Sequence, residues 1–270
     1  MDEQWLAEQF EQQRNRLRGV AYRMLGSLSE ADDAVQQGWL KLSRSDAGEI
    51  ENLAGWLTTV VARVCLDMMR SRESRREDAL DAQPITSASN PEDEALLADS
   101  IGLALLVVLD TLDPAERLAF VLHDMFGMPF DEIARIVDRS PAAARQLASR
   151  ARRRVQGKPA IPESNLARQR EVVDAYLAAA RAGDFNALLA VLDPNIRGGA
   201  EAIAERAIKA GARAARPALV NGAVGIVIAP RGRLFMVLQL KIARGKIVEM
   251  DTITDPARLR ELDLAVLSTR

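Results

Sequence analysis

Hydrophobic and polar positions divide the chain into four blocks that predict different kinds of structure. Residues 1–76 and 98–157 place apolar side chains at the three- and four-residue spacing of amphipathic helices. Residues 77–97 are acidic, contain two prolines and lack an apolar period, so they predict a linker. Residues 164–270 start with a helical pattern and end in three β-rich segments, LVNGAVGIVIAP, RLFMVLQLKIA and KIVEMDTIT, with RG and ARGK as candidate hairpin turns.

The stretch PFDEIARIVDRSPAAARQLASRARRRV, residues 129–155, predicts two helices joined by a tight turn. Ser140 is placed to cap the second helix, and Pro141 suits its first position because no N–H is needed there. The packing side of the second helix is small or apolar: Ala144, Leu147, Ala148, Ala151 and Val155. Its other side is polar and basic: Arg145, Gln146, Ser149, Arg152 and Arg153. This pattern predicts a helix-turn-helix whose second helix reads the major groove of DNA.

The distribution of charge supports this interpretation. The chain has 36 Lys and Arg against 38 Asp and Glu, a formal net charge of -2, yet residues 139–158 contain seven basic residues and no acid. Clustered arginines pair with DNA phosphates, which would repel carboxylates. The alternative is an ordinary solvated helix end, because basic side chains also interact favourably with the C-terminal end of a helix dipole.

The first block predicts two further helices with charged faces. In AYRMLGSLSEADDAVQQGWLKL, Ser29 is expected to cap a helix that buries Val35, Trp39 and Leu42. Its opposite face exposes Asp32, Asp33, Gln36 and Gln37. In NLAGWLTTVVARVCLDMMRSRESRRE, the expected buried face is Trp56, Val60, Val64 and Met68. The polar face of that helix carries Arg63, Asp67, Arg70, Arg72, Arg75 and Arg76.

Few residues are available for catalysis or metal binding. Cys65 and His123 are the only cysteine and histidine, which excludes the usual zinc sites. Both lie in apolar helical stretches, so we expect a buried, inert thiol and a packed imidazole. We expect no enzyme activity, no cofactor and no metal. The absence of a secretory signal, and of any apolar run near the about 20 residues of a membrane span, indicates a cytoplasmic protein with no membrane partner.

The motifs of residues 5–157 resemble the extracytoplasmic-function (ECF) RNA polymerase sigma factors. ADDAVQQGWLKL is similar to the region 2 helix that docks on the polymerase clamp coiled coil, and GWLTTVVARVCLDMMRSRESRRE to the helix that meets the −10 promoter element. LDPAERLAFVLHDMFGMPFDEIARIVDRSPAAARQLASRARRRV resembles region 4, which reads the −35 element. The resemblance implies binding to RNA polymerase core, through its clamp coiled coil and flap, and to promoter DNA.

The resemblance also implies roles for individual residues. The residues that match the polymerase-binding stretch are Asp32, Asp33, Gln36 and Trp39, with Trp39 packing from beneath. Those that match the −10 helix are Arg63, Asp67, Arg70 and Arg72. Those that match the −35 reader are Arg145, Gln146, Ser149, Arg150, Arg152 and Arg153.

Residues 166–267 resemble a SnoaL-like cone-shaped α+β domain, which in one group of ECF sigma factors modulates activity in cis. The linker reads DAQPITSASNPED where that group carries Trp-Leu-Pro-Glu-Pro, and LDPNIRGGAEAIA leaves almost no room for the usual strand and Gly-rich loop. We therefore expect an incomplete cone with an open pocket. Asp193, Asp251 and Asp255 are candidate acid–base residues, but Asp193 and Asp255 precede prolines, where a turn or capping role suffices. DPARLREL, residues 255–262, resembles the segment that this group uses near its sigma-domain interface.

The expected architecture is multi-domain, with two all-α sigma domains followed by an α+β domain. The expected ranges are sigma region 2 at 1–76, an acidic linker at 77–97, region 4 with its helix-turn-helix at 98–157, and the SnoaL-like domain at 164–270. A small molecule or an intramolecular surface is the expected partner of this last domain. The alternative is a one-component helix-turn-helix regulator with a ligand-sensing domain, which leaves the first block unexplained. A SnoaL-like cyclase or isomerase with a helical extension is disfavoured because residues 164–270 contain no histidine.

Overall fold

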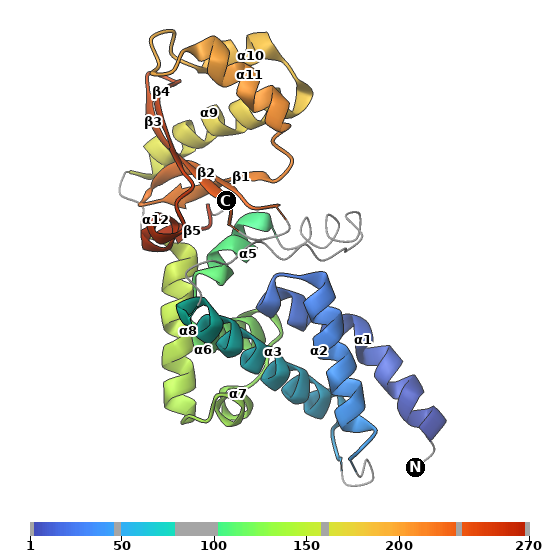
Figure 1. The fold of residues 1–270 in the computed structure, drawn as a ribbon. Coiled ribbons are helices and arrows are strands. Elements are labelled where there is room, and N and C mark those ends of the chain that lie inside the picture. Colours follow the sequence, from blue (N-terminus) through green and yellow to red (C-terminus); the bar gives the residue numbers. More distant parts are fainter. Residues whose placement is uncertain (1–2, 46–49, 79–101, 158–161, 231–233, 268–270) are drawn as a thin grey trace. The chain divides into compact units, whose positions relative to one another are not determined.

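The computed structural model describes residues 3–45, 50–78, 102–157, 162–230 and 234–267 (Figure 1). The chain forms two compact units, here called unit 1 and unit 2. Unit 1 combines residues 1–97 with 112–152, and unit 2 combines residues 98–111 with 153–270. The segment 98–157, which the sequence groups as one domain, is therefore divided between them. Most of the predicted linker at 77–97 lies outside the described residues.

Three long helices open unit 1: α1 (Glu3–Leu25), α2 (Leu28–Leu42) and α3 (Leu53–Asp78). Each packs against the other two around fully buried side chains such as Leu17 and Leu57. Gly38 lets α2 approach α3 closely, because a Cβ at this position would lie 2.8 Å from Val61 Cγ2. The predicted buried positions Val35 and Leu42 of α2 are confirmed, and Trp39 is half-buried.

Two local predictions for these helices were wrong. Ser27, not Ser29, caps α2, and its hydroxyl accepts the Glu30 N–H at 3.5 Å. Gly26 has a φ of 73° and ends the preceding helix, so Ser27 is already the extended residue that a cap requires. In α3 the fully buried stripe is Leu57, Val61 and Cys65. The predicted stripe lies beside it: Val64 is buried, but Trp56, Val60 and Met68 are only partly covered. The stripe shifts because α3 packs against helices on more than one side.

The helix-turn-helix prediction is confirmed. This segment consists of α6 (Pro114–Phe120), the π-helical turn η2 (Val121–Met125), α7 (Phe130–Val137) and α8 (Pro141–Gln156). All of it belongs to unit 1 except the end of α8 after Arg152. Ser140 Oγ accepts the Ala143 N–H at 3.2 Å, and Pro141 is the first residue of α8. Asp138 ends α7 in the left-handed region, with a φ of 55°. Within unit 1, α3 packs against α6 and α7, and α1 packs against η2.

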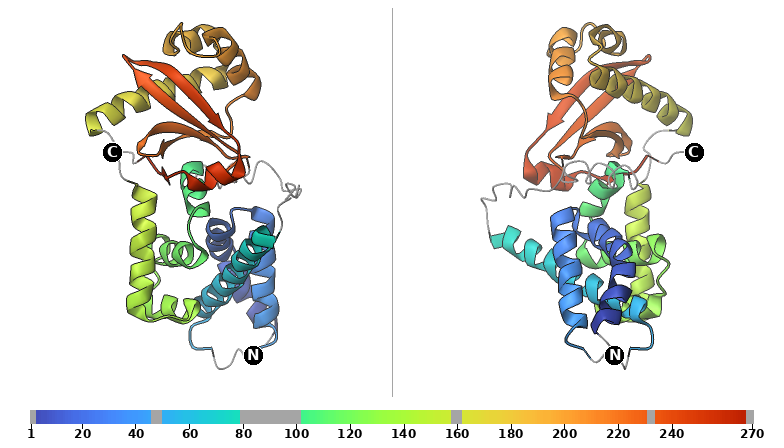
Figure 2. Two further views of the ribbon diagram at one scale, coloured as in Figure 1. Left: turned by 60° about the vertical axis from the view of Figure 1, so that its left-hand side comes forward. Right: turned by 90° about the vertical axis from the view of Figure 1, so that its right-hand side faces the viewer.

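Unit 2 is an antiparallel sheet with helices, which confirms the α+β prediction. Its helices are α5 (Leu103–Asp110), α9 (Glu163–Ala182), α10 (Phe185–Val191), α11 (Ala200–Ala210) and α12 (Pro256–Glu261). Its strands are β1 (Ala215–Val220), β2 (Ala223–Ile228), β3 (Met236–Ala243), β4 (Lys246–Ile253) and β5 (Leu264–Ala265), in the order β4-β3-β2-β1-β5. Figure 2 shows α9, α10 and α11 gathered on one face of this sheet. Tyr176 and Leu177 of α9 meet Ile226, Leu240 and Ile247 of the sheet in one buried core.

The three β-rich segments contain more than three strands, because one of them forms two. The first segment contains a hairpin, because Asn221 and Gly222 have φ values of 51° and 80° and turn β1 into β2. Asn-Gly with two positive φ angles is the favoured two-residue hairpin turn. The ARGK turn is confirmed at Arg244 and Gly245, between β3 and β4. The RG candidate at 231–232 lies outside the described residues.

The shortage of chain between α10 and α11 has a structural consequence. A strand at this point is reduced to one parallel bridge between Leu192 and Ile247, supported by the Asp193 N–H, which donates to the Ile247 carbonyl at 3.0 Å. The expectation of a missing strand is therefore confirmed. Among the residues that the structure describes, this single bridge is the pairing at the outer edge of β4.

Candidate functional site

The outer face of α8 presents the residues predicted to read DNA. Arg145, Gln146 and Ser149 are exposed, while Ala144 and Ala148 on the opposite side are fully buried. The Arg145 guanidinium lies 5.6 Å from the centre of the Phe130 ring on α7, a cation–π distance. Small side chains thus seat the helix on its support, and long polar ones project from the far side.

Two further arginines of α8 are partly engaged inside unit 1. Arg152 Nε donates to Asp124 Oδ1 at 2.8 Å, so its guanidinium is directed toward η2. Arg150 Nη1 lies 3.6 Å from the Oε1 atom of Glu116, a buried carboxylate that is 4% exposed. Arg153 is exposed. The arginines of the basic face therefore differ in their contacts. Arg145 is exposed, whereas Arg152 also joins α8 to η2.

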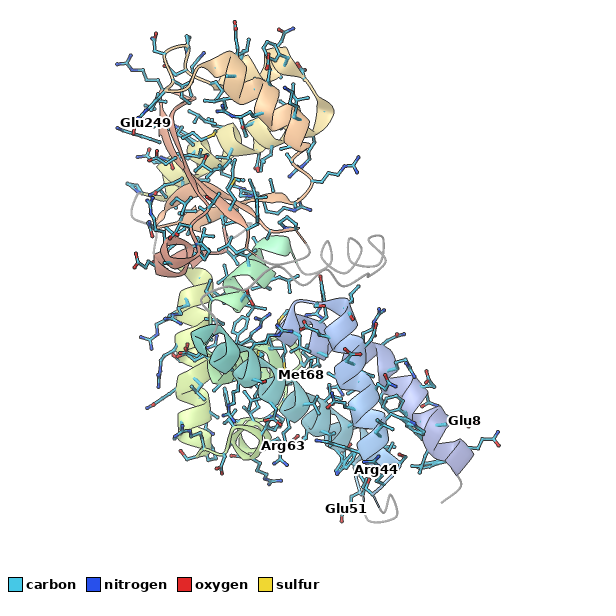
Figure 3. The ribbon with its side chains drawn as sticks, viewed as in Figure 1. Glu8, Arg44, Glu51, Arg63, Met68 and Glu249 are labelled. Carbon is cyan, nitrogen blue, oxygen red and sulfur yellow. The ribbon has the colours of Figure 1, made fainter. Side chains whose placement is uncertain are left out.

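The face of α3 predicted to meet the −10 element is also outward. Arg63, Asp67 and Arg70 are all exposed, at the spacing of one helix side. Arg63 lies beside α7 in Figure 3, and its Nη2 donates to the Arg135 carbonyl at 3.0 Å. Arg72 differs, because it pairs with the Glu30 carboxylate and donates to the Leu25 carbonyl at 3.2 Å. The structure thus holds Arg72 within the helical bundle.

The predicted polymerase-binding stretch forms one surface of α2. Asp33 and Gln36 are exposed and make no hydrogen bond or ion pair within the described ranges. Asp32 is held by α1, since Arg18 Nε lies 2.7 Å from Asp32 Oδ1. Trp39 packs on Phe10 of α1 with ring centres 5.1 Å apart, which supports the expectation that it packs from beneath. A small pocket of about 130 Å³ adjoins this pair and is lined by Ala7, Phe10, Glu11, Arg14 and Trp39.

Cys65 and His123, the residues considered for chemistry, have structural roles. Burial raises the pKa of the Cys65 thiol to about 12, so the thiol stays protonated and poorly nucleophilic at neutral pH. His123 Nδ1 lies 3.0 Å from the Met128 carbonyl oxygen, and its ring stacks on Phe130. In the described part of the chain, no group of three or more His, Cys, Asp or Glu residues could hold a metal ion. Within the same described ranges, no helix is both long and apolar enough to span a membrane.

Two of the three acidic candidates of unit 2 have local roles. Asp193 Oδ1 accepts the Asn195 N–H at 2.8 Å, and Asp255 Oδ1 caps α12 by accepting the Arg258 N–H at 2.8 Å. Asp251 is exposed on β4. The turn and capping roles predicted for Asp193 and Asp255 are therefore confirmed.

Sequence reasoning missed a buried polar contact in unit 1. Arg117 of α6 is only 3% exposed, and its Nε donates to the Arg23 carbonyl of α1 at 3.1 Å. Burial lowers the pKa of Arg23, whose guanidinium lies 5.2 Å from the Phe126 ring centre. A sequence signal for this burial exists, because Arg117 lies within the apolar helical run AERLAFVL. These contacts join the helices of the first block to the helix-turn-helix segment.

Comparison with known proteins places the chain among sigma factors. It matches the family models for Sigma-70 region 2 over residues 9–75 and for Sigma-70, region 4 over residues 102–155. It is 35% identical over 263 residues to the probable ECF RNA polymerase sigma factor SigI of Mycobacterium tuberculosis (strain ATCC 25618 / H37Rv), which covers 90% of this chain and 91% of the relative. It is 40% identical over 200 residues to the ECF RNA polymerase sigma factor SigJ of the same strain, covering 70% and 62% of the two chains.

Among solved structures, the crystal structure of SigJ from M. tuberculosis aligns with a TM-score of 0.49 at 29% identity, over 93% of this chain and 97% of that one. The order of region 2 before region 4, predicted from the motifs, is confirmed by the two matched ranges. With this order and a relative similar over almost the full length of both chains, the protein belongs to the family of ECF RNA polymerase sigma factors.

Proposed function

We propose that the protein binds core RNA polymerase and directs promoter-specific initiation of transcription. The observation that carries this proposal is the 35% identity to an ECF sigma factor over 263 residues, with region 2 and region 4 both matched and in order. No separate catalytic activity is proposed, because two of the three candidate acids, Asp193 and Asp255, serve a turn and a cap. The protein's contribution is recognition, and polymerase supplies the chemistry.

The proposed surfaces follow from the exposed faces of three helices. On α2, Asp33 and Gln36 offer free polar groups to the polymerase clamp, while Asp32 and Trp39 are supported by α1. On α3, Arg63, Asp67 and Arg70 are proposed to meet the −10 element. On α8, the proposed −35 contacts are Arg145, Gln146, Ser149, Arg150, Arg152 and Arg153. Arg72, Arg150 and Arg152 already have acidic partners, so promoter binding by these three requires exchange of those partners.

Unit 1 is proposed to be a resting arrangement of the two DNA-reading segments. The helix assigned to the −10 element packs against α6 and α7, and Arg63 donates to a backbone carbonyl of α7. The Arg63 N–H engaged in this way is not available to DNA while this contact persists. We propose that binding to polymerase separates α3 from the helix-turn-helix, because both must then face DNA.

The C-terminal α+β domain is proposed to be a shortened SnoaL-like domain that modulates this activity in cis. Residues 102–155, matched as region 4, begin with α5, and α5 packs against β1 and β5 of unit 2. At the other end of the match, the Val155 carbonyl accepts the Val266 N–H at 2.9 Å. Both ends of the matched segment thus contact the C-terminal domain. The sequence-based ranges 1–76, 77–97, 98–157 and 164–270 remain proposed functional domains.

Binding of the purified chain to core RNA polymerase, followed by run-off transcription, tests this function. We expect a stable complex and promoter-dependent transcripts that are absent with core enzyme alone. Duplex DNA binding by the free chain without any affinity for polymerase would contradict the proposal and favour a one-component regulator. The Asp33→Ala/Gln36→Ala double variant is the matched negative control, since neither side chain supports the fold.

A further inference from the structure

We infer that unit 2 contains a binding site for a small oxyanion, a molecule carrying a phosphate or carboxylate group, between α9 and strand β1. An open pocket of about 490 Å³ lies here, lined by Asp174, Arg181, Arg213, Arg216 and Pro217. The lining arginines come from two segments more than 30 residues apart, so no local motif in the sequence reveals them. Arginine is the side chain best suited to the site, because its planar guanidinium matches carboxylate and phosphate oxygens in pairs.

Two of the arginines are anchored to the same backbone oxygen. Arg181 Nη2 donates to the Ala215 carbonyl at 3.0 Å, and Arg216 Nη1 donates to that carbonyl at 3.0 Å. Arg216 Nη1 also donates to the Arg213 carbonyl at 2.8 Å. Two guanidinium groups that share one acceptor are held side by side, which concentrates positive charge at the start of β1. Because backbone atoms fix both groups, little side-chain freedom is lost when an anion binds.

The charges lining the pocket are predominantly positive. Arg213 is exposed, and its guanidinium has no hydrogen bond or ion pair with the residues that the structure describes. Asp174 is the acid among the lining residues, and it already accepts from Arg170 Nε at 3.4 Å. The pocket lining therefore has three arginines and one carboxylate, and that carboxylate also interacts with Arg170. An oxyanion bound among them would relieve the repulsion between like charges.

The sheet leaves this position accessible. Within the described residues, strand β5 pairs with β1 at Leu219 and Val220 and does not reach Arg216 and Pro217. Pro217 has no N–H to offer to another strand, which keeps the edge open. On the face of the sheet under α9, by contrast, buried side chains such as Tyr176 and Ile226 fill the interior. The pocket at the edge therefore suits a small polar ion better than a large apolar ligand.

The site also shares a strand with the proposed control element. Strand β1 carries the pocket and contacts α5, which belongs to the segment matched as region 4. A bound anion could therefore influence that segment through β1 and its contact with α5. This last step rests on the proposed function, whereas anion binding itself does not.

Isothermal titration calorimetry of the full chain, at constant ionic strength, tests the site with sodium phosphate and, separately, with citrate. We expect saturable binding of at least one anion, and the arm that binds more tightly distinguishes a phosphate from a carboxylate ligand. The Arg181→Gln/Arg213→Gln double variant should bind roughly tenfold more weakly, because two charge-assisted contacts are lost. Arg197→Gln is the matched control, since Arg197 is an exposed arginine of the same unit that does not line the pocket.

Two results would overturn the inference. The first is that neither anion binds the wild-type chain. The second is that the double variant binds an anion as tightly as wild type does, which would place the anion elsewhere. Arg213→Gln alone guards against misfolding of the double variant, because no hydrogen bond or ion pair of that side chain occurs within the described residues. It should still weaken binding about threefold, and unchanged affinity would count against the site. The titration contains no polymerase and no DNA, so its failure would leave the proposed function untouched.

Discussion

Arg63 of α3 donates a hydrogen bond of 3.0 Å to the backbone carbonyl of Arg135 on α7. This bond joins the helix assigned to the −10 element to the helix-turn-helix assigned to the −35 element. It acts together with Arg117, which crosses from α6 to the Arg23 carbonyl of α1. The first three helices and the helix-turn-helix segment, to which we assign the promoter contacts, are therefore held to each other by bonds that end on backbone oxygens.

Removing the hydrogen bond from Arg117 to the Arg23 carbonyl should lower the stability of the chain and raise its affinity for polymerase. Arg117→Met keeps most of the buried volume but leaves the Arg23 carbonyl unpaired, so we expect the free energy of unfolding to fall by about 1–3 kcal/mol. Affinity for core polymerase should rise, because less free energy is then needed to separate the helix-turn-helix segment, which includes α6, from the first three helices. Urea unfolding and a polymerase-binding titration measure the two quantities. Arg16→Met, at an exposed position of α1, should change neither. A parallel loss of stability and affinity would contradict the resting-state proposal.

The α2 surface should be needed for polymerase binding and not for folding. Asp33→Ala/Gln36→Ala removes two exposed polar groups that make no contact within the described residues, so the melting temperature should stay unchanged. Affinity for core polymerase should fall by about 2 kcal/mol, roughly 30-fold, if these residues lie at the centre of the interface. Glu8→Ala, at an exposed position of α1, is the control. Equal affinity of both variants would show that α2 does not form the interface.

Arg145 should determine specificity at one base pair. Arg145→Ala should cost about 1–3 kcal/mol on the preferred −35 sequence and less on sequences altered at that position. The fold should tolerate the change, since the Arg145 contact with the Phe130 ring is on the surface. Binding to a library of −35 sequences measures the profile. A uniform loss across all sequences would instead indicate a phosphate contact.

Cys65 should make stability depend on alkaline pH. Burial raises the pKa of its thiol from 9.0 to about 12, so below pH 9 the thiol is protonated in both the folded and unfolded states. Between pH 9 and 12 only the unfolded state ionises, which lowers the free energy of unfolding as pH rises. Wild type should therefore lose about 1 kcal/mol relative to Cys65→Ala between pH 8.5 and pH 10, as measured by urea unfolding. Parallel pH profiles for the two proteins would show that the thiol does not titrate in this way.

Docking of α5 on the sheet should link the C-terminal domain to transcription. Leu109 is fully buried in α5, and Leu109→Asp would place a carboxylate in that apolar environment. We expect promoter-directed transcription to change while Arg145-dependent binding to the −35 sequence persists. Leu109→Met, which conserves volume, is the matched control and should behave as wild type. If transcription were the same with both substitutions, α5 would not transmit control from the sheet.

The sequence by itself determined the local elements and the family. Ser140 and Pro141 start α8, and Ala144, Ala148 and Ala151 define its packing side, because capping and helical period depend on residues within a few positions. The two hairpin turns at Asn221 and Arg244 are equally local, although only the second was predicted. Such signals survive without knowledge of any distant segment.

Tertiary structure decided which surfaces these elements share. The periodicity of α3 indicates that one side is buried but not what covers it, so the stripe at Leu57 and Val61 was predicted one position away. The ion pair between Arg72 and Glu30 and the bond from Arg117 to Arg23 join residues far apart in sequence. The same is true of the carbonyl of Ala215, which gathers Arg181 and Arg216. Only the folded chain brings such partners together, because no local rule of spacing specifies a contact across dozens of residues.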